Sequence, residues 1–385
     1  MSTTRVTGRD VGTGQGIAVT VTGGRIAAIE PTDPEAGLSG PYLAAGLIDL
    51  QVNGYRGLDL NDGALTPERV IELTQMMTTL GVTTYLPTLI TASRASLLAA
   101  LASIAAARRQ DPLSARMIPF VHVEGPFLAT EDGPRGAHPL EHVRAPDLDE
   151  VAEWQRVSGG LVGKITLSPH YDQVSDFIRA LVGQGILVAI GHTSATAGQI
   201  HAAAAAGARL STHLGNGAAA NLPRHPNFIW AQLANDGLDA GFITDGFHLP
   251  ADTFKAMLRA KGMDRAYLVS DTAALGGMPP GVYDQPIGGR VEVGSDGRLS
   301  VLGTPYLAGA SRPLCEDVAL AVRMADLSLS DALRLATSNP GRFVGHRGRL
   351  AVGEAADLVL FDWERGAASL AIRKTYVAGK RCGPE

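Results

Sequence analysis

Apolar runs alternate with helical patterns through the middle of the chain. Near-continuous apolar strands separated by helices predict a parallel sheet, because parallel strands are buried on both faces. About eight such strands predict a TIM-type (β/α)8 barrel. The runs lie at residues 46–52, 82–88, 117–124, 163–167, 187–192, 209–213, 239–245 and 267–271.

Both ends of the chain have a different pattern, because they read as β-structure without helices. Residues 17–30 predict a hairpin that turns at Gly23 and Gly24, and two strand-like segments occur near the C-terminus. We therefore expect residues 45–345 to form the barrel and residues 1–44 with 346–385 to form a small β domain. Residues 288–303 read as a hairpin inserted after the eighth strand.

Composition narrows the function classes. Apolar residues make up 45% and charged residues 18% of the 385 residues, which is typical of a globular protein. The net charge of −5 gives no reason to expect nucleic-acid binding. No apolar run is long enough to span a membrane, and the N-terminus lacks a secretory signal. The two cysteines, Cys315 and Cys382, have no metal-type spacing, which is consistent with a reducing cytoplasm.

Polar residues end several predicted strands, where the chemistry of such barrels is found. Glu124, His192 and His213 end the third, fifth and sixth strands. Burying these groups together is costly unless a cation pairs them. Two imidazoles and one carboxylate, with a fourth position open, form a pattern of catalytic zinc sites. We predict one divalent metal ion per chain, with zinc preferred, although iron, cobalt and manganese accept the same ligands.

Asp271 ends the eighth strand and is left over from this ligand set. A carboxylate beside water activated by a metal can take its proton and pass it to a leaving group. That chemistry suits amide hydrolysis. Two alternatives remain, since Asp271 could be a fourth ligand or a helix cap.

Gln51 and Asn53 end the first strand, where many metal hydrolases have a His-x-His pair. Their i, i+2 spacing places both side chains on one face. Neutral amides can hydrogen-bond water or substrate but bind a metal poorly. We therefore expect them to occupy the position of a second metal, which leaves a mononuclear site.

The other histidines are less decisive. His122 faces the same side of its strand as Glu124, so it either supports the metal ligands or fills the barrel. His138 lies on a long loop after the third strand, which either runs over the surface or carries His138 across the site. His142, His170, His201 and His346 read as structural or exposed.

Several sequence blocks resemble the N-acetylglucosamine-6-phosphate deacetylase family of the amidohydrolase superfamily, over nearly the whole chain. The blocks are GLIDLQVNGYRGLDLND, HVEGPFL, GHTSAT, THLGNG, TDGFHL and LVSDTAAL, in the family's order. The resemblance implies a (β/α)8 barrel with a small β-sandwich built from both chain ends. It implies that Glu124, His192 and His213 bind the metal and that Asp271 is the acid/base. The implied reaction converts N-acetylglucosamine 6-phosphate to glucosamine 6-phosphate and acetate.

The resemblance also implies roles on the substrate side. It makes His138 the group that polarises the acetyl carbonyl and His248 a substrate contact. Asn216, with Gly217 beside it, matches a position near the sugar phosphate. Arg224 matches an arginine that reaches the phosphate across a homodimer interface, although by itself it would read as a solvated loop charge.

The chain departs from the family at the substrate end. Gly215 and Gly217 stand where the family usually has a bulky residue and an alanine, and His170 stands where it commonly has a glutamate. The exact sugar and the need for its phosphate therefore stay open. The alternatives are another N-acyl substrate, such as an unphosphorylated amino sugar or an N-acyl amino acid, and a non-catalytic barrel.

Overall fold

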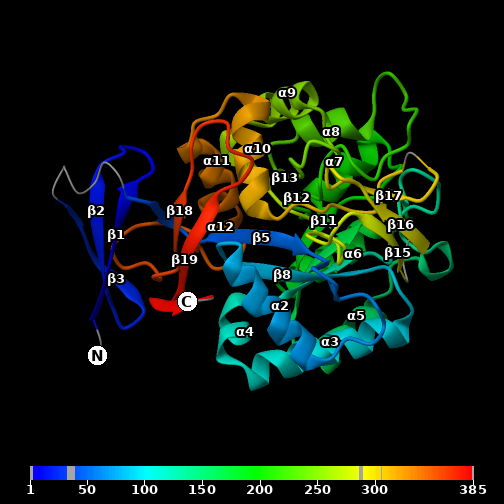
Figure 1. The fold of residues 1–385 in the computed structure, drawn as a ribbon. Helices are drawn as coiled ribbons and strands as arrows, with labels where there is room; N and C mark the ends of the chain where they lie inside the picture. Colours follow the sequence, from blue (N-terminus) through cyan, green and yellow to red (C-terminus); the bar gives the residue numbers. More distant parts are fainter. Residues whose placement is uncertain (1–2, 33–39, 286–288, 305, 384–385) are drawn as a thin grey trace.

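The computed structural model describes residues 3–32, 40–285, 289–304 and 306–383. Its central feature is an eight-stranded parallel sheet with the strands in chain order, which curves into a nearly closed barrel (Figure 1). The prediction of a (β/α)8 barrel is confirmed. The strands are β5 (Leu47–Val52), β8 (Val82–Ile90), β9 (Val121–Glu124), β10 (Val162–Leu167), β11 (Leu187–Ile190), β12 (Leu210–Ser211), β13 (Asp239–Phe242) and β14 (Ala266–Leu268).

The first and last barrel strands meet just beyond the end of β14. Val52 and Thr272 form a parallel bridge there, and the backbone N–H of Asp271 donates to the carbonyl of Gln51 over 3.0 Å. Every residue of β5 is buried, including the polar Asp49 and Gln51. The closure therefore brings the polar end of the first strand beside that of the eighth.

Helices surround the barrel and bury apolar side chains against it. Helix α2 begins after Thr66, whose side chain accepts a hydrogen bond from Arg69 N, and it buries Val70, Leu73 and Met77 at helical spacing. The helices are α2 (Pro67–Thr79), α3 (Arg94–Gln110), α4 (Pro112–Met117), α5 (Leu148–Ser158), α6 (Val174–Gly183), α7 (Ala197–Ala205), α8 (Phe228–Ala234), α9 (Ala251–Lys261), α10 (Leu314–Ala325), α11 (Leu329–Ala336) and α12 (Ser338–Gly341), with short 3-10 turns η1 (Leu140–His142) and η2 (Met263–Arg265).

The two chain ends build one seven-stranded sheet on the side of the barrel (Figure 1). Strand β18 runs antiparallel to β4, so that Leu358 lies opposite Ala45. The predicted β character of both ends is confirmed, while the boundaries at 44/45 and 345/346 stay a prediction. The order is β20 (Lys380–Cys382), β19 (Ala371–Val377), β18 (Leu358–Asp362), β4 (Tyr42–Ala45), β1 (Thr3–Asp10), β2 (Gly16–Thr22) and β3 (Arg25–Pro31).

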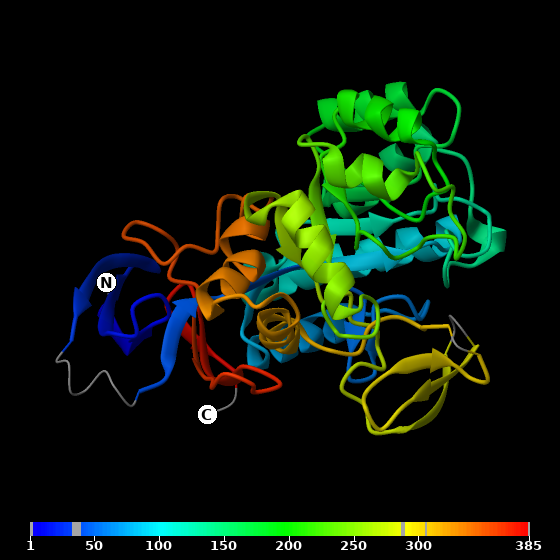
Figure 2. The same ribbon diagram turned by 90° about the horizontal axis from the view of Figure 1, so that it is seen from above.

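A third small sheet follows the eighth barrel strand, on the far side of the barrel from the sheet of the chain ends (Figure 2). It contains β15 (Gly281–Gln285), β16 (Gly289–Val293) and β17 (Leu299–Val301), all antiparallel. The predicted hairpin therefore has an additional strand, β15, which is largely exposed and lacks a clear apolar pattern. Two short strands, β6 (Gly54–Tyr55) and β7 (Leu58–Asp59), follow the first barrel strand.

Two chemical expectations can be compared with this fold. No helix in the described part of the chain is long and apolar enough to cross a membrane. Cys315 is buried and Cys382 half-buried, and both are free thiols.

Candidate metal and catalytic site

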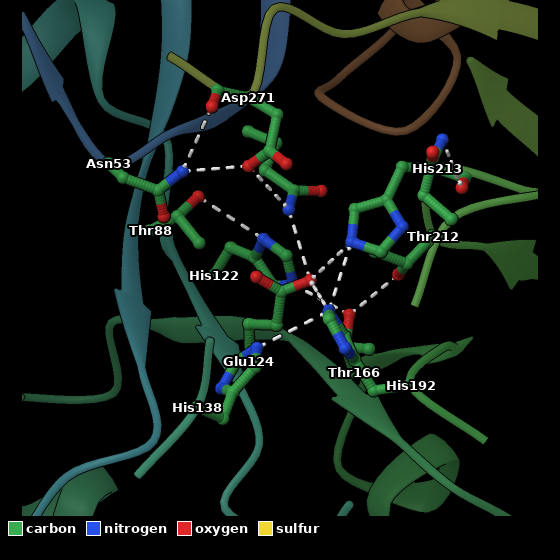
Figure 3. Close-up of polar contacts among 12 residues, drawn as sticks. Asn53, Thr88, His122, Glu124, His138, Thr166, His192, Thr212, His213 and Asp271 are labelled. Carbon is green, nitrogen blue, oxygen red and sulfur yellow. Dashed lines mark hydrogen bonds and ion pairs between the residues drawn. The ribbon is translucent and has the colours of Figure 1, made fainter. Parts of the chain in front are cut away.

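Glu124, His192 and His213, which we call the metal-ligand group, meet at the C-terminal mouth of the barrel (Figure 3). The Nε2 atoms of the two histidines lie 3.1 Å apart, and Glu124 Oε1 lies 3.1 Å from His213 Nε2 and 3.4 Å from His192 Nε2. All three side chains are buried. Ligands about 2.0–2.1 Å from a tetrahedral ion are about 3.4 Å apart, so this group fits a single metal ion.

The carbonyl of Pro134 orients one ligand. His192 Nδ1 lies 2.9 Å from this oxygen. A carbonyl can only accept, so Nδ1 carries the hydrogen and Nε2 keeps the lone pair that a metal needs. A Cβ atom on Gly217, which has a φ of +57°, would lie 2.7 Å from His192 Nδ1. The absence of a side chain at Gly217 therefore allows its backbone to pack against the ring.

The electrostatics of the group favour a bound cation. Burial alone would raise the pKa of Glu124, but hydrogen bonds and charge from His192 and His213 hold it well below its usual value. Burial lowers the pKa of His192, but the hydrogen bond and the negative charge of Glu124 raise it by more. The pKa of His192 is therefore above its usual value. The carboxylate therefore stays ionised and draws positive charge to the ring nitrogens, which protons or a metal ion can supply.

Asp271 is held by the two amides at the end of the first strand. Its Oδ1 accepts hydrogen bonds from Gln51 Nε2 over 2.9 Å and from Asn53 Nδ2 over 2.7 Å. Gln51 Nε2 also donates to Glu124 Oε1 over 3.0 Å, so one amide joins both carboxylates. Burial and the negative charge of Glu124 raise the pKa of Asp271, which suits a group that must accept and return a proton.

Backbone strain is concentrated at this mouth. His192, His213 and Asp271 have φ values of +49°, +27° and +52°. Such values are uncommon for residues other than glycine and persist only where the surrounding structure imposes them, often at functional sites.

His138 lies inside the site and not on the outer surface of its loop. It is buried, and its Nε2 lies 3.3 Å from His192 Nε2. Burial and the neighbouring His192 lower the pKa of His138 well below its usual value, so the ring is neutral. The structure therefore selects, of the two positions considered for this residue, the one over the site.

His248 is oriented by Asp245, which the sequence reasoning missed. Asp245 Oδ2 lies 2.7 Å from His248 Nδ1, and its Oδ1 accepts from the backbone N–H groups of Phe247 and His248. The spacing D-x-x-H in TDGFHL is the signal that could have indicated this turn, because Asp side chains cap backbone groups two and three residues on.

The remaining predicted substrate residues are less constrained. Asn216 Nδ2 donates to the carbonyl of His213 over 3.2 Å, which holds it beside the metal-ligand group. Arg224 is exposed and has no hydrogen bond or ion pair within the described ranges.

Two other histidines stay outside the metal-ligand group. His122 is buried and hydrogen-bonds Thr88 Oγ1 over 3.2 Å and Thr166 Oγ1 over 2.7 Å, which supports barrel filling (Figure 3). His170 Nδ1 lies 2.6 Å from Ser168 Oγ. Within the described ranges, His170 makes no hydrogen bond or ion pair to a member of the metal-ligand group.

A family model, curated relatives and solved structures all indicate the same kind of protein. A model of the Amidohydrolase family matches residues 42–382. The chain is 31% identical over 324 residues to N-acetylglucosamine-6-phosphate deacetylase of Bacillus subtilis, covering 83% of this chain and 80% of that protein. It is 32% identical over 331 residues to N-acetylgalactosamine-6-phosphate deacetylase of a Shewanella species, covering 86% and 81%. A solved structure of a Mycobacterium smegmatis N-acetyl-D-glucosamine-6-phosphate deacetylase variant, in complex with N-acetyl-D-glucosamine-6-phosphate, has a TM-score of 0.88 at 29% identity and covers 100% of both chains.

Proposed function

The chain belongs to the amidohydrolase family, and on that premise we propose that it hydrolyses the acetamide of N-acetylglucosamine 6-phosphate. The products are glucosamine 6-phosphate and acetate. The observation that carries the proposal is the convergence of Glu124, His192 and His213 beside a carboxylate with a raised pKa, in a chain similar along most of its length to such deacetylases.

The metal-ligand group would hold one divalent ion, and we propose zinc because two imidazoles and one carboxylate are a zinc donor set. Such an ion supplies a Lewis acid that lowers the pKa of water and polarises a carbonyl. Gln51 and Asn53 fill the second-metal position with amide N–H groups that already donate to Glu124 and Asp271. These donors favour a site with a single ion.

Asp271 transfers the proton in this reaction, and His138 stabilises the negative charge on the carbonyl oxygen. Asp271 takes a proton from the attacking water as the water oxygen bonds to the carbonyl carbon. His138 donates a hydrogen bond to the carbonyl oxygen, where negative charge develops. Asp271 then returns the proton to the nitrogen as the C–N bond breaks, which releases the amine and acetate.

Substrate binding falls to the loops after the sixth and seventh barrel strands. His248, oriented by Asp245, contacts the sugar, and Asn216 with Gly217 lies toward the phosphate. Arg224 has no partner among the described residues, which supports a role toward the phosphate bound in a second subunit of a homodimer. A cytoplasmic location, based on the two free thiols, stays a prediction.

Acetate release from a panel of substrates tests the proposal. The panel contains N-acetylglucosamine 6-phosphate, its galactosamine epimer, unphosphorylated N-acetylglucosamine and an N-acetyl amino acid, each with zinc-loaded protein. We expect the highest kcat/KM for N-acetylglucosamine 6-phosphate. The epimer is the second candidate, because a deacetylase of N-acetylgalactosamine 6-phosphate is 32% identical to this chain. Activity on none of the four, with zinc bound, would support a non-catalytic barrel.

A further inference from the structure

Thr91 lies directly after β8 and directs both of its hydrogen-bonding donors at one atom of His138. Its Oγ1 lies 2.9 Å from His138 Nδ1, and its backbone N–H donates to the same nitrogen over 3.4 Å. Thr91 and His138 are both buried. The two residues are 47 positions apart in the sequence, so only the fold brings them together.

The backbone contact identifies which nitrogen of His138 carries the hydrogen. A backbone N–H can only donate, and the described structure gives the N–H of Thr91 no other acceptor. A buried N–H needs a partner. His138 Nδ1 must therefore be the unprotonated nitrogen, which the Thr91 hydroxyl can also reach as a donor. The hydrogen of the neutral ring then lies on Nε2.

A glycine makes room for this contact. A Cβ atom on Gly125, which has a φ of +82°, would lie 2.2 Å from Thr91 Oγ1. Any side chain at Gly125 would displace the hydroxyl from its position beside His138. Gly125, directly after β9, therefore leaves space for Thr91, directly after β8.

The tautomer matters because of what His138 Nε2 faces. This atom lies 3.3 Å from His192 Nε2, at the edge of the metal-ligand group. With the hydrogen on Nε2, His138 is a hydrogen-bond donor toward that group. With the hydrogen on Nδ1, it would present a lone pair, as the ligand histidines do, and would compete for the position that the substrate oxygen needs.

We propose that Thr91 is a positioning residue that holds His138 in the Nε2–H tautomer, which makes His138 a donor to the substrate carbonyl and not a fourth metal ligand. The catalytic half of this inference rests on the proposed function. The tautomer itself does not depend on which substrate is hydrolysed.

Nitrogen NMR of the zinc-loaded protein, with 15N-labelled histidine, tests the tautomer directly. The signals of His138 are identified by their loss in His138→Gln. We expect a pyridine-type Nδ1 and a protonated Nε2 in the wild type and in Thr91→Ser. In Thr91→Val the hydrogen should move in part to Nδ1. Thr88→Val is the matched control, because it removes a buried hydroxyl of β8, three residues before Thr91, that contacts Nδ1 of His122 and not His138. In this variant the His138 signals should not change.

Kinetics on the same variants test the consequence. We expect Thr91→Val to lower kcat about tenfold, which is less than the 10²–10³-fold loss on removing an oxyanion donor outright, because the backbone N–H still favours the correct tautomer. KM and zinc content should stay near the wild-type values, and Thr91→Ser should retain activity. If Thr91→Val does not fold, Thr91→Ala replaces it.

Three results would overturn the proposal. They are a wild-type His138 with its hydrogen on Nδ1, a Thr91→Val variant with an unchanged tautomer, and a changed tautomer with unchanged kcat. A wild-type protein that releases no acetate from any substrate would count against the proposed function alone, because the NMR comparison still decides the tautomer.

Discussion

Asn53 and Asp271 are joined by a 2.7 Å hydrogen bond from the amide nitrogen to the carboxylate, where the first and eighth barrel strands meet. Gln51 donates to the same oxygen and also to Glu124. The neutral amide of Gln51 therefore lies between the two carboxylates, where a second cation could otherwise lie, and Asn53 adds a second amide on Asp271. This arrangement supports both the mononuclear proposal and the role of Asp271.

Replacing Asp271 by Asn should remove the proton carrier and leave the metal-ligand group intact. We expect kcat to fall by about 10²–10⁴-fold with unchanged zinc content, measured by acetate release and elemental analysis. Asp252→Asn, at an exposed position in the first turn of α9, is the control. If Asp271→Asn retained most of the activity, another group would have to carry the proton.

Metal analysis should find about one tightly bound ion per chain, because the first strand offers amides and no imidazoles. The double variant with Gln51→His and Asn53→His creates a His-x-His pair on this strand and should bind a second ion. Elemental analysis after dialysis measures both proteins. Two tightly bound ions in the wild type would contradict the role given to these amides.

Gly217→Ala should weaken zinc binding. Its Cβ would lie 2.7 Å from His192 Nδ1, so the ring that holds Nε2 in place must shift. We expect a loss of about 10–100-fold in affinity, as for other residues that orient a ligand, measured by competition with a chelator. Gly159→Ala is the control, since its φ is also positive, +69°, but nothing lies within 4 Å of its Cβ. Equal losses in both variants would point to backbone strain alone.

Arg224→Met should raise KM for phosphorylated substrates and change little for unphosphorylated ones. The cross-subunit role has a sharper test, in which Arg224→Met and Asp271→Asn proteins are mixed and allowed to exchange subunits. A mixed dimer would contain one complete site, with Asp271 from one chain and Arg224 from the other, so activity should recover. No recovery in proven mixed dimers would place Arg224 in its own subunit's site or outside both.

Lys261 should make stability depend on pH. It is buried, and its Nζ donates to the carbonyls of Gln232 and Asn235 over 2.8 and 2.7 Å. Burial lowers its pKa from 10.5 to about 8. Between these values the unfolded chain binds more protons, so the free energy of unfolding should rise with pH from 8 toward 10.5.

Urea unfolding at several pH values between 8 and 10.5 measures the slope of the free energy of unfolding against pH. Lys261→Met should reduce it by up to about 1.4 kcal/mol per pH unit, the value for one proton. Lys255→Met, on the same helix, removes a lysine without touching either carbonyl and is the control. An unchanged slope in Lys261→Met would mean that the burial of Lys261 does not alter its titration.

The sequence determined the barrel and the candidates at its mouth. Alternating apolar runs and helices predicted the parallel sheet, and the carboxyl ends of parallel strands lie at one edge of the barrel. Glu124, His192, His213 and Asp271 could therefore be placed together from their positions at strand ends alone. These conclusions rest on local patterns and on a single rule of barrel geometry.

Only the tertiary structure decided how each ring and carboxylate is oriented. The Pro134 carbonyl sets the tautomer of His192, and the backbone N–H of Thr91 donates to His138 from 47 residues away. The amides of Gln51 and Asn53 point at Asp271 because the barrel closes between the first and eighth strands. Hydrogen bonds depend on tenths of an ångström between segments distant in sequence, and no local pattern of residues specifies such distances.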